Sequence, residues 1–207
     1  MKIKFAFIIT LFAWFALIAQ FFLMLQNRQA DLFETIIRFF CFFTILTNLL
    51  VALCFTAIAF NLHLFFFKVL SKHSSLTALT AFILIVGLVY QFALRNLWNP
   101  TGLQFIVDEL LHSMIPLLVL IYWIINVAKT KVEIKPVMCW LIYPILYIVI
   151  ILVRGAISGF YPYPFLNITQ IGYEKAFINI GLIFGIAFIL LAILIGINKV
   201  FTSKMPG

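Results

Sequence analysis

The sequence predicts an all-α integral membrane protein, a six-transmembrane-helix bundle with both termini in the cytoplasm. Two properties of the composition carry the class prediction: 66% of the 207 residues are hydrophobic and only 10% are charged. Soluble globular domains have roughly 45–50% apolar and about 25% charged residues. The composition therefore excludes a soluble enzyme domain, a disordered chain and a nucleic-acid-binding module.

Long apolar windows predict the number of spans. A bilayer core of about 30 Å needs about 20 apolar residues in each helix. Six windows of this kind lie at residues 5–25, 39–60, 76–95, 104–126, 136–157 and 174–198. The polar stretches between them are too short for a separate soluble domain, so we expect a single transmembrane domain over residues 1–207. The first window is longer than the core of a signal peptide and is interpreted as an uncleaved span.

The distribution of basic residues predicts the orientation. With the N-terminus in the cytoplasm, the cytoplasmic side carries Lys2, Lys4, Lys68, Lys72, Lys129, Lys131, Lys135, Lys199 and Lys204. The opposite side carries only Arg28, Arg38, Arg95, Arg154 and Lys175. This asymmetry follows the rule that Lys and Arg concentrate in short cytoplasmic loops. We therefore interpret the net charge of +8 as a topology signal and a contact with anionic lipids of the bilayer, and expect no nucleic-acid partner.

Polar side chains within the spans gather in one half of the predicted bundle. Such groups are costly inside a bilayer and usually face the bundle interior or a wet cavity. Every span contributes to the half near the non-cytoplasmic face, with Gln20, Arg38, Thr44, Thr47, Asn48, Tyr90, Gln91, Arg95, Asp108, Glu109, His112, Ser113, Tyr147, Arg154 and Asn179. We expect these residues to surround one polar cavity that opens toward that face.

Thr44 and His112 are candidates for catalysis in this cavity. At 1.5 Å per residue, Thr44 lies roughly 9 Å and His112 roughly 12 Å below the start of its span, so the two are at similar depth. A hydroxyl becomes a useful nucleophile when a base takes its proton. Asp108 and Glu109 precede His112 by four and three residues, so either carboxylate shares its helix face and could orient the imidazole. The alternatives are a threonine bonded to its own backbone and a purely interhelical His–carboxylate pair.

Other polar residues are candidates for a supporting role. Arg38 and Arg154 could bind an acidic head group or stabilise an oxyanion, and Gln91 and Tyr147 could also contact a substrate. Asn48, one turn after Thr44, is a second candidate oxyanion donor. Walls of Phe, Leu and Ile would accept acyl chains.

No metal or cofactor is expected. Glu109-x-x-His112 resembles half of a di-iron carboxylate site, but such a site needs a second Glu-x-x-His and two further Glu. The chain has six acidic residues in all, and the remaining four lie in loops or at span ends. A mononuclear zinc site would need more ligands at the same depth.

The connection at residues 158–173 contains Tyr161-Pro162-Tyr163-Pro164-Phe165. Two prolines two residues apart favour an extended backbone. The three aromatic side chains fit an anchor at the membrane interface, which is the favoured interpretation. The alternative is a lid or rim over a cavity.

Four stretches of the chain together resemble the bacterial branch of the androgen-induced family of six-span membrane proteins. They are Arg38 to Leu53 (RFFCFFTILTNLLVAL), Val86 to Arg95 (VGLVYQFALR), Asp108 to Trp123 (DELLHSMIPLLVLIYW) and Tyr143 to Leu166 (YPILYIVIILVRGAISGFYPYPFL). Their order and spacing carry the resemblance, which covers nearly the whole chain.

The resemblance implies a threonine hydrolase that cleaves fatty acid esters of hydroxy fatty acids, with its Thr in the second span and its His in the fourth. By position these residues match Thr44 and His112, and Thr47, one turn further on, is an alternative nucleophile. The implied substrate is a membrane lipid or other long-chain ester, and the implied location is a bacterial inner (plasma) membrane.

Two other functions fit the same pattern. A polar cavity also suits a non-catalytic lipid- or small-molecule-binding membrane protein or a small transporter, although transporters often show internal repeats and none is evident in this chain. A structural or assembly partner within the membrane would use the many Phe residues as a contact surface, but it would leave the one-sided polar cluster unexplained.

Overall fold

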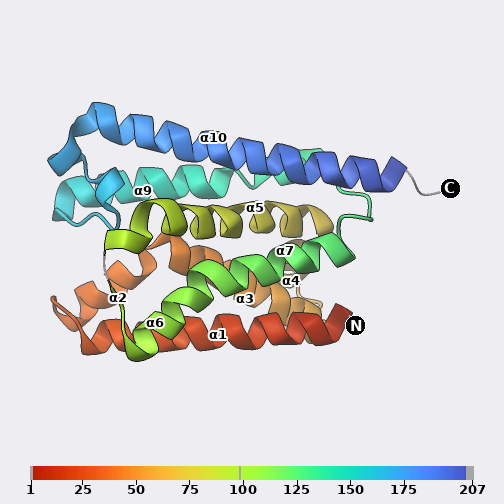
Figure 1. The fold of residues 1–207 in the computed structure, drawn as a ribbon, viewed down its shortest axis with the longest axis horizontal. Helices are drawn as coiled ribbons and strands as arrows, with labels where there is room; N and C mark the ends of the chain where they lie inside the picture. The colour runs from red at the N-terminus through yellow and green to blue at the C-terminus, as the bar shows by residue number, and fades with distance from the viewer. Residues whose placement is uncertain (1, 98, 204–207) are drawn as a thin grey trace.

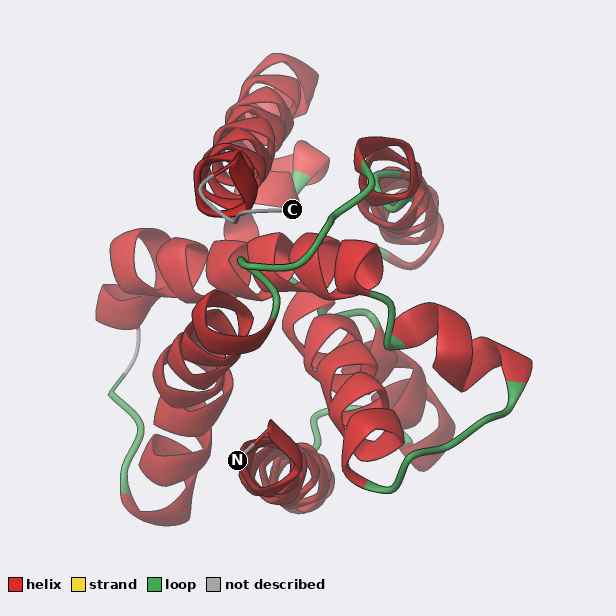
Figure 2. Cartoon of the chain, turned by 90° about the vertical axis from the view of Figure 1, so that its right-hand side faces the viewer, coloured by secondary structure: helices red, strands yellow, loops and turns green. Residues whose placement is uncertain are grey.

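The computed structural model describes residues 2–97 and 99–203, which form helices joined by short connections (Figure 1). Figure 2 shows helices and loops but no strand in these residues. Five helical segments are long and apolar enough to cross a membrane: Lys2–Gln26 (α1), His73–Leu97, Gly102–Asn126, Ile134–Ser158 and Ile168–Ser203 (α10). A sixth span results if the bent pair Leu32–Phe40 (α2) and Phe43–Ala59 (α3) is counted as one. The fold is a helical bundle compatible with a multi-pass membrane protein.

Several segments consist of more than one element. Residues 73–97 divide into α5 (His73–Val89), the π-helical turn η1 (Tyr90–Leu94) and the 3₁₀ turn η2 (Arg95–Leu97). Residues 102–126 divide into α6 (Gly102–Glu109), the π-helical turn η3 (Leu110–Met114) and α7 (Ile115–Asn126). Residues 134–158 divide into α8 (Ile134–Cys139) and α9 (Ile142–Ser158). Two short helices, α4 (Phe65–Leu70) and η4 (Pro164–Leu166), lie in the connections. Gly172, with a φ of 80°, interrupts the start of α10.

The start of α1 and the end of α10 lie at the same end of the bundle (Figure 1). This arrangement is compatible with two termini on one side of a membrane. Lys204, which contributes to the predicted cytoplasmic charge, lies outside the described residues.

Residues 39–60 do not form the continuous helix that the apolar window suggests. The chain breaks at Cys41 and Phe42, and the axes of α2 and α3 differ by 71°. Groups released by the break find partners elsewhere, because unpaired backbone groups are costly in an apolar environment. The Tyr147 hydroxyl donates to the Cys41 carbonyl oxygen over 2.8 Å, and the Thr44 N–H donates to Tyr163 Oη over 3.3 Å. Two distant tyrosines therefore stabilise the break.

The window at residues 136–157 is also interrupted, between α8 and α9. Pro144 has no N–H for the carbonyl of Trp140, four residues earlier, and so disfavours a continuous helix there. The Trp140 carbonyl instead accepts a hydrogen bond from the Tyr143 N–H over 3.1 Å.

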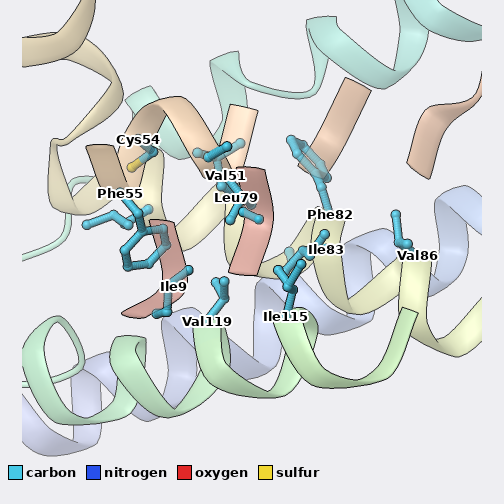
Figure 3. Packing of buried hydrophobic residues seen from close by; sticks show 14 of the residues in the cluster. Ile9, Val51, Cys54, Phe55, Leu79, Phe82, Ile83, Val86, Ile115 and Val119 are labelled. Carbon is cyan, nitrogen blue, oxygen red and sulfur yellow. The ribbon is translucent and has the colours of Figure 1, made fainter. Parts of the chain in front are cut away.

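Buried apolar side chains from α1, α3, α5 and α7 form the core. Figure 3 shows Ile9, Phe55, Leu79 and Val119, one from each of these helices, converging on the same region. α5 contributes most, and it lies between α10 at one edge of the bundle and α1 at the other (Figure 1). α9 and α10 expose apolar side chains along much of their length, as expected for helices that face lipid.

Indole N–H groups provide polar ties between the helices. Trp14 donates to Thr56 over 3.0 Å, Trp123 donates to Thr77 over 2.8 Å and Trp140 donates to Ser75 over 3.1 Å. Each bond pairs an indole donor with a hydroxyl on another helix, so each helps to select the helix pairing.

Gly87 allows α5 to approach η3 closely. A Cβ at this position would lie 2.9 Å from the His112 carbonyl oxygen and 3.5 Å from Pro116 Cβ. Pro116 cannot donate a backbone hydrogen bond to that carbonyl, which lies four residues before it. The wider π-helical turn and the proline thus lie directly against a glycine.

We expect Gly87→Ala to destabilise the protein by about 1–3 kcal/mol, because the new methyl group meets backbone that cannot move without shifting η3. Thermal unfolding in detergent, followed by circular dichroism, measures this loss. Gly185→Ala is the matched control, since a Cβ on this α10 glycine would meet no described atom within 4 Å. Equal stability of the two variants would contradict the close approach.

Candidate functional site

The side chains of Thr44 and His112 meet inside the bundle. Thr44 Oγ1 lies 3.4 Å from His112 Nε2. Thr44 belongs to the first turn of α3, and His112 is the central residue of η3. The break before α3 therefore gives Thr44 a helix N-terminus, where backbone N–H groups lack intrahelical partners.

A hydrogen bond to the backbone determines which ring nitrogen of His112 faces Thr44. His112 Nδ1 lies 2.9 Å from the Asp108 carbonyl oxygen. A carbonyl can only accept, so Nδ1 carries the proton and Nε2 presents its lone pair to the Thr44 hydroxyl. The Asp108 carboxylate is also close, with Oδ1 3.9 Å from Nδ1. It is placed to stabilise a positive charge on the ring.

Tyr90 holds His112 from a second direction. The two rings are stacked, with centroids 4.1 Å apart and planes 11° from parallel. The Tyr90 hydroxyl donates to Asp108 Oδ2 over 3.2 Å, so one tyrosine contacts both the imidazole and the carboxylate beside it. Tyr90 begins η1 and His112 lies in η3, so both residues come from π-helical turns, which often occur at functional sites.

Tyr163 completes the surroundings of the Thr44 hydroxyl. Tyr163 Oη lies 3.4 Å from Thr44 Oγ1 and also accepts the Thr44 backbone N–H. Tyr163 is 8% exposed, and burial raises the pKa of its phenol, so the hydroxyl stays neutral and keeps a proton to donate. Sequence reasoning did not single out Tyr163.

The aromatic connection at residues 158–166 borders the site, as the rim interpretation expects. Phe160, Pro162 and Tyr163 line the cavity that contains Thr44 and His112. Tyr161 packs onto α9 at Gly155, where a Cβ would overlap its ring. In the sequence, the paired prolines indicated an extended connection at this position. They did not show which side chains the connection borders, because those side chains come from distant spans.

Thr47 and Asn48 have roles different from those expected. Thr47 is fully buried, and its hydroxyl lies 2.8 Å from that of Tyr143, so it points away from the imidazole. Asn48 Nδ2 donates to the carbonyl oxygens of Thr44 and Leu111 over 2.9 and 3.3 Å. Both amide hydrogens are therefore used to tie α3 to η3, which leaves none for an oxyanion.

Glu109 lies in a separate network beside the site. Its carboxylate accepts hydrogen bonds from Arg95 over 2.6 Å and from Ser113 over 2.7 Å. Gln91 donates to the same serine over 2.8 Å and accepts from Arg95 over 2.5 Å. The network joins η1 and η2 to η3, so Gln91 and Glu109 help to hold the two π-helical turns together.

Arg38 and Arg154 share one carboxylate, that of Glu34. Arg38 Nε lies 2.7 Å from Glu34 Oε1, and Arg154 Nη2 lies 2.7 and 2.8 Å from the two oxygens of the same group. Both guanidinium groups also face the Phe160 ring, at 4.4 and 5.3 Å from its centroid. The cluster ties α2 to α9 and to the aromatic connection, and Arg38 also lines the cavity.

The cavity has a volume of about 850 Å³ and lies at the end of the bundle away from the start of α1. Its walls come from the last turns of α1, from α2, from α6 and from the aromatic connection. Polar residues line its outer part. There Gln104 of α6 donates a hydrogen bond to Gln20 of α1 over 2.8 Å. Thr44, Asp108 and His112 lie in its wall, so all three residues border this space.

The site contains a hydroxyl, an imidazole whose Nε2 faces that hydroxyl, a carboxylate and a phenol. Within residues 2–97 and 99–203, no group of three or more His, Cys, Asp or Glu side chains is arranged to hold a metal ion. Comparisons of the chain with protein-family models, with curated proteins and with solved structures find no match. The arrangement has the components needed for nucleophilic attack on a carbonyl carbon.

We expect Asn48→Leu to lower the unfolding free energy by about 1–3 kcal/mol, because two backbone carbonyls lose a buried donor. Asn126→Leu is the control, since the Asn126 amide donates within its own helix, to the Tyr122 carbonyl oxygen. Thermal unfolding of the two variants in the same detergent measures the difference. A larger loss in Asn126→Leu would contradict the role of Asn48 as a tie between helices.

Proposed function

We propose that this chain is an intramembrane lipid-ester hydrolase in which Thr44 is the nucleophile and His112 is the general base. The observation that carries the proposal is the alignment of the unprotonated Nε2 of His112 with the Thr44 hydroxyl, at 3.4 Å, while Nδ1 is held by the Asp108 carbonyl. Thr47 is not the proposed nucleophile, because its hydroxyl is paired with Tyr143.

The proposed reaction has two halves. In the first, His112 Nε2 takes the Thr44 proton while Oγ1 attacks the ester carbonyl carbon. Tyr163 donates to the developing oxyanion, and the nearby Asp108 carboxylate stabilises the imidazolium. His112 then gives its proton to the departing alkoxide oxygen, which releases the alcohol and leaves an acyl ester on Thr44. In the second half, His112 takes a proton from water, the resulting hydroxide attacks the acyl carbon, and Thr44 leaves with the proton from His112.

Apolar surroundings and the sequence resemblance support the substrate class. The cavity combines a polar outer part with apolar walls such as Phe39, Phe42 and Leu111, which suits a lipid with one polar end. The resemblance to the androgen-induced family favours fatty acid esters of hydroxy fatty acids. We further propose that both termini are cytoplasmic, that the membrane is a bacterial plasma membrane, and that the cavity opens toward the non-cytoplasmic face.

Thr44→Ala and His112→Ala should each lower the kcat for a long-chain ester by about 10³-fold or more. The first removes the nucleophile and the second removes the base that activates it, and neither works without the other. Hydrolysis by purified protein in detergent measures this effect. Thr47→Val should retain most of the activity. A fluorophosphonate probe should label the wild-type protein at Thr44.

Two results would contradict this assignment. Undiminished turnover in both alanine variants would exclude the Thr44–His112 pair. Saturable binding of a long-chain ester by the wild-type protein, with no turnover and no fluorophosphonate labelling, would favour the alternative function of a non-catalytic lipid-binding protein.

Tyr163→Phe should lower kcat by about 10²-fold with little change in KM, because the lost hydroxyl stabilises charge that develops only in the transition state. Tyr161→Phe is the matched control in the same segment, since the Tyr161 hydroxyl is buried and has no hydrogen-bond partner among the described residues. Steady-state kinetics of both variants separate the two parameters. A change confined to KM in Tyr163→Phe would assign that residue to substrate binding alone.

A further inference from the structure

Two separate spaces reach the Thr44 side chain. One is the cavity of about 850 Å³, and the other is a narrow apolar pocket of about 60 Å³. Thr44, Tyr163 and Leu94 line both spaces. The lining residues that belong to α1, α2 and α6 border the large cavity alone, whereas those that belong to α5, α9 and α10 border the apolar pocket alone. Figure 1 shows α9 and α10 on the other side of α5 from α1, so the lining residues indicate that the spaces extend from Thr44 in different directions.

The position of His112 distinguishes the two spaces chemically. His112 lines the large cavity but not the apolar pocket. In the proposed reaction the departing alkoxide must receive its proton from His112, so the alcohol part of the ester has to lie on the side that His112 faces. The acyl part is attached to the same carbonyl carbon and points away from the leaving group. It therefore extends to the other side of Thr44.

We propose that the apolar pocket binds the acyl chain and that the large cavity binds the alcohol part of the substrate. This division rests on the proposed hydrolase function. The substrates are then esters of a slim, unbranched acyl group with a bulky or polar alcohol, because only the large cavity has width and a polar outer part. Selectivity for acyl length is set by residues of the pocket that do not touch the cavity.

Ala187 and Phe184 of α10 are the residues that test this division. Both line the apolar pocket and neither lines the large cavity. Ala187→Leu narrows the pocket, and Phe184→Ala widens it. Ala192→Leu is the matched control, because Ala192 is an exposed residue of the same helix that lines neither space.

The experiment uses two series of esters with the purified full chain. In the first, the alcohol is 4-nitrophenol and the acyl group lengthens from acetate to octanoate. In the second, the acyl group is acetate and the alcohol grows from ethanol to a long-chain hydroxy acid. For each variant, the readout is the ratio of kcat/KM for the longest ester of a series to kcat/KM for the shortest. Both values come from the same preparation, so the ratio does not depend on the fraction of protein that is folded.

Ala187→Leu should lower the octanoate-to-acetate ratio about tenfold, and Phe184→Ala should raise it, while the alcohol series stays unchanged in both. Ala192→Leu should match the wild type in both series. Mass spectrometry of the trapped intermediate should find the acyl group on Thr44.

A shift in the alcohol series instead of the acyl series would overturn the division, and so would unchanged ratios in both pocket variants. These results differ from failure of the hydrolase proposal itself, in which the wild-type protein would turn over no ester of either series.

Discussion

The hydrogen bond between His112 Nδ1 and the Asp108 carbonyl oxygen is the interaction on which the candidate site depends. It fixes the ring proton on Nδ1, so Nε2 faces Thr44 as an acceptor. Without this bond, either ring nitrogen of His112 could carry the proton. The Thr44 hydroxyl could then be either the donor or the acceptor in its contact with His112. The carbonyl lies four residues before His112, near the end of α6, so the bond is local to one continuous helical segment.

Irregular helix geometry brings the residues of the candidate site together. The break between α2 and α3 places Thr44 at a helix start, while η1 and η3 turn Tyr90 and His112 toward each other. Gly87 and Asn48 then hold α5 and α3 against η3, one by the absence of a side chain and the other by two hydrogen bonds. The break between α2 and α3 releases backbone groups that a bilayer cannot satisfy, and Tyr147 and Tyr163 from distant segments bond two of them.

Charged groups near the site serve mainly to hold the bundle together. Glu34 neutralises part of the charge of Arg38 and Arg154, and Glu109 does the same for Arg95. Such pairing is expected because an isolated charge within a membrane protein is costly. The groups that lie nearest to Thr44 and His112 are the Tyr163 phenol and the Asp108 carboxylate.

Composition and apolar window length by themselves determined the helical class, the approximate limits of the long helices and the gathering of polar residues toward one end, because hydrophobicity acts through local sequence alone. They also placed Thr44 and His112 at similar depth. Only the tertiary structure decided that Thr44 and not Thr47 faces the imidazole, that Asp108 and not Glu109 contacts it, and that Tyr163 joins them. The physical reason is that the helix break and the rotation of each helix about its axis are set by partners such as Tyr147 and Tyr163, more than 100 residues away from the groups they satisfy. No local pattern in a uniformly apolar stretch records such partners.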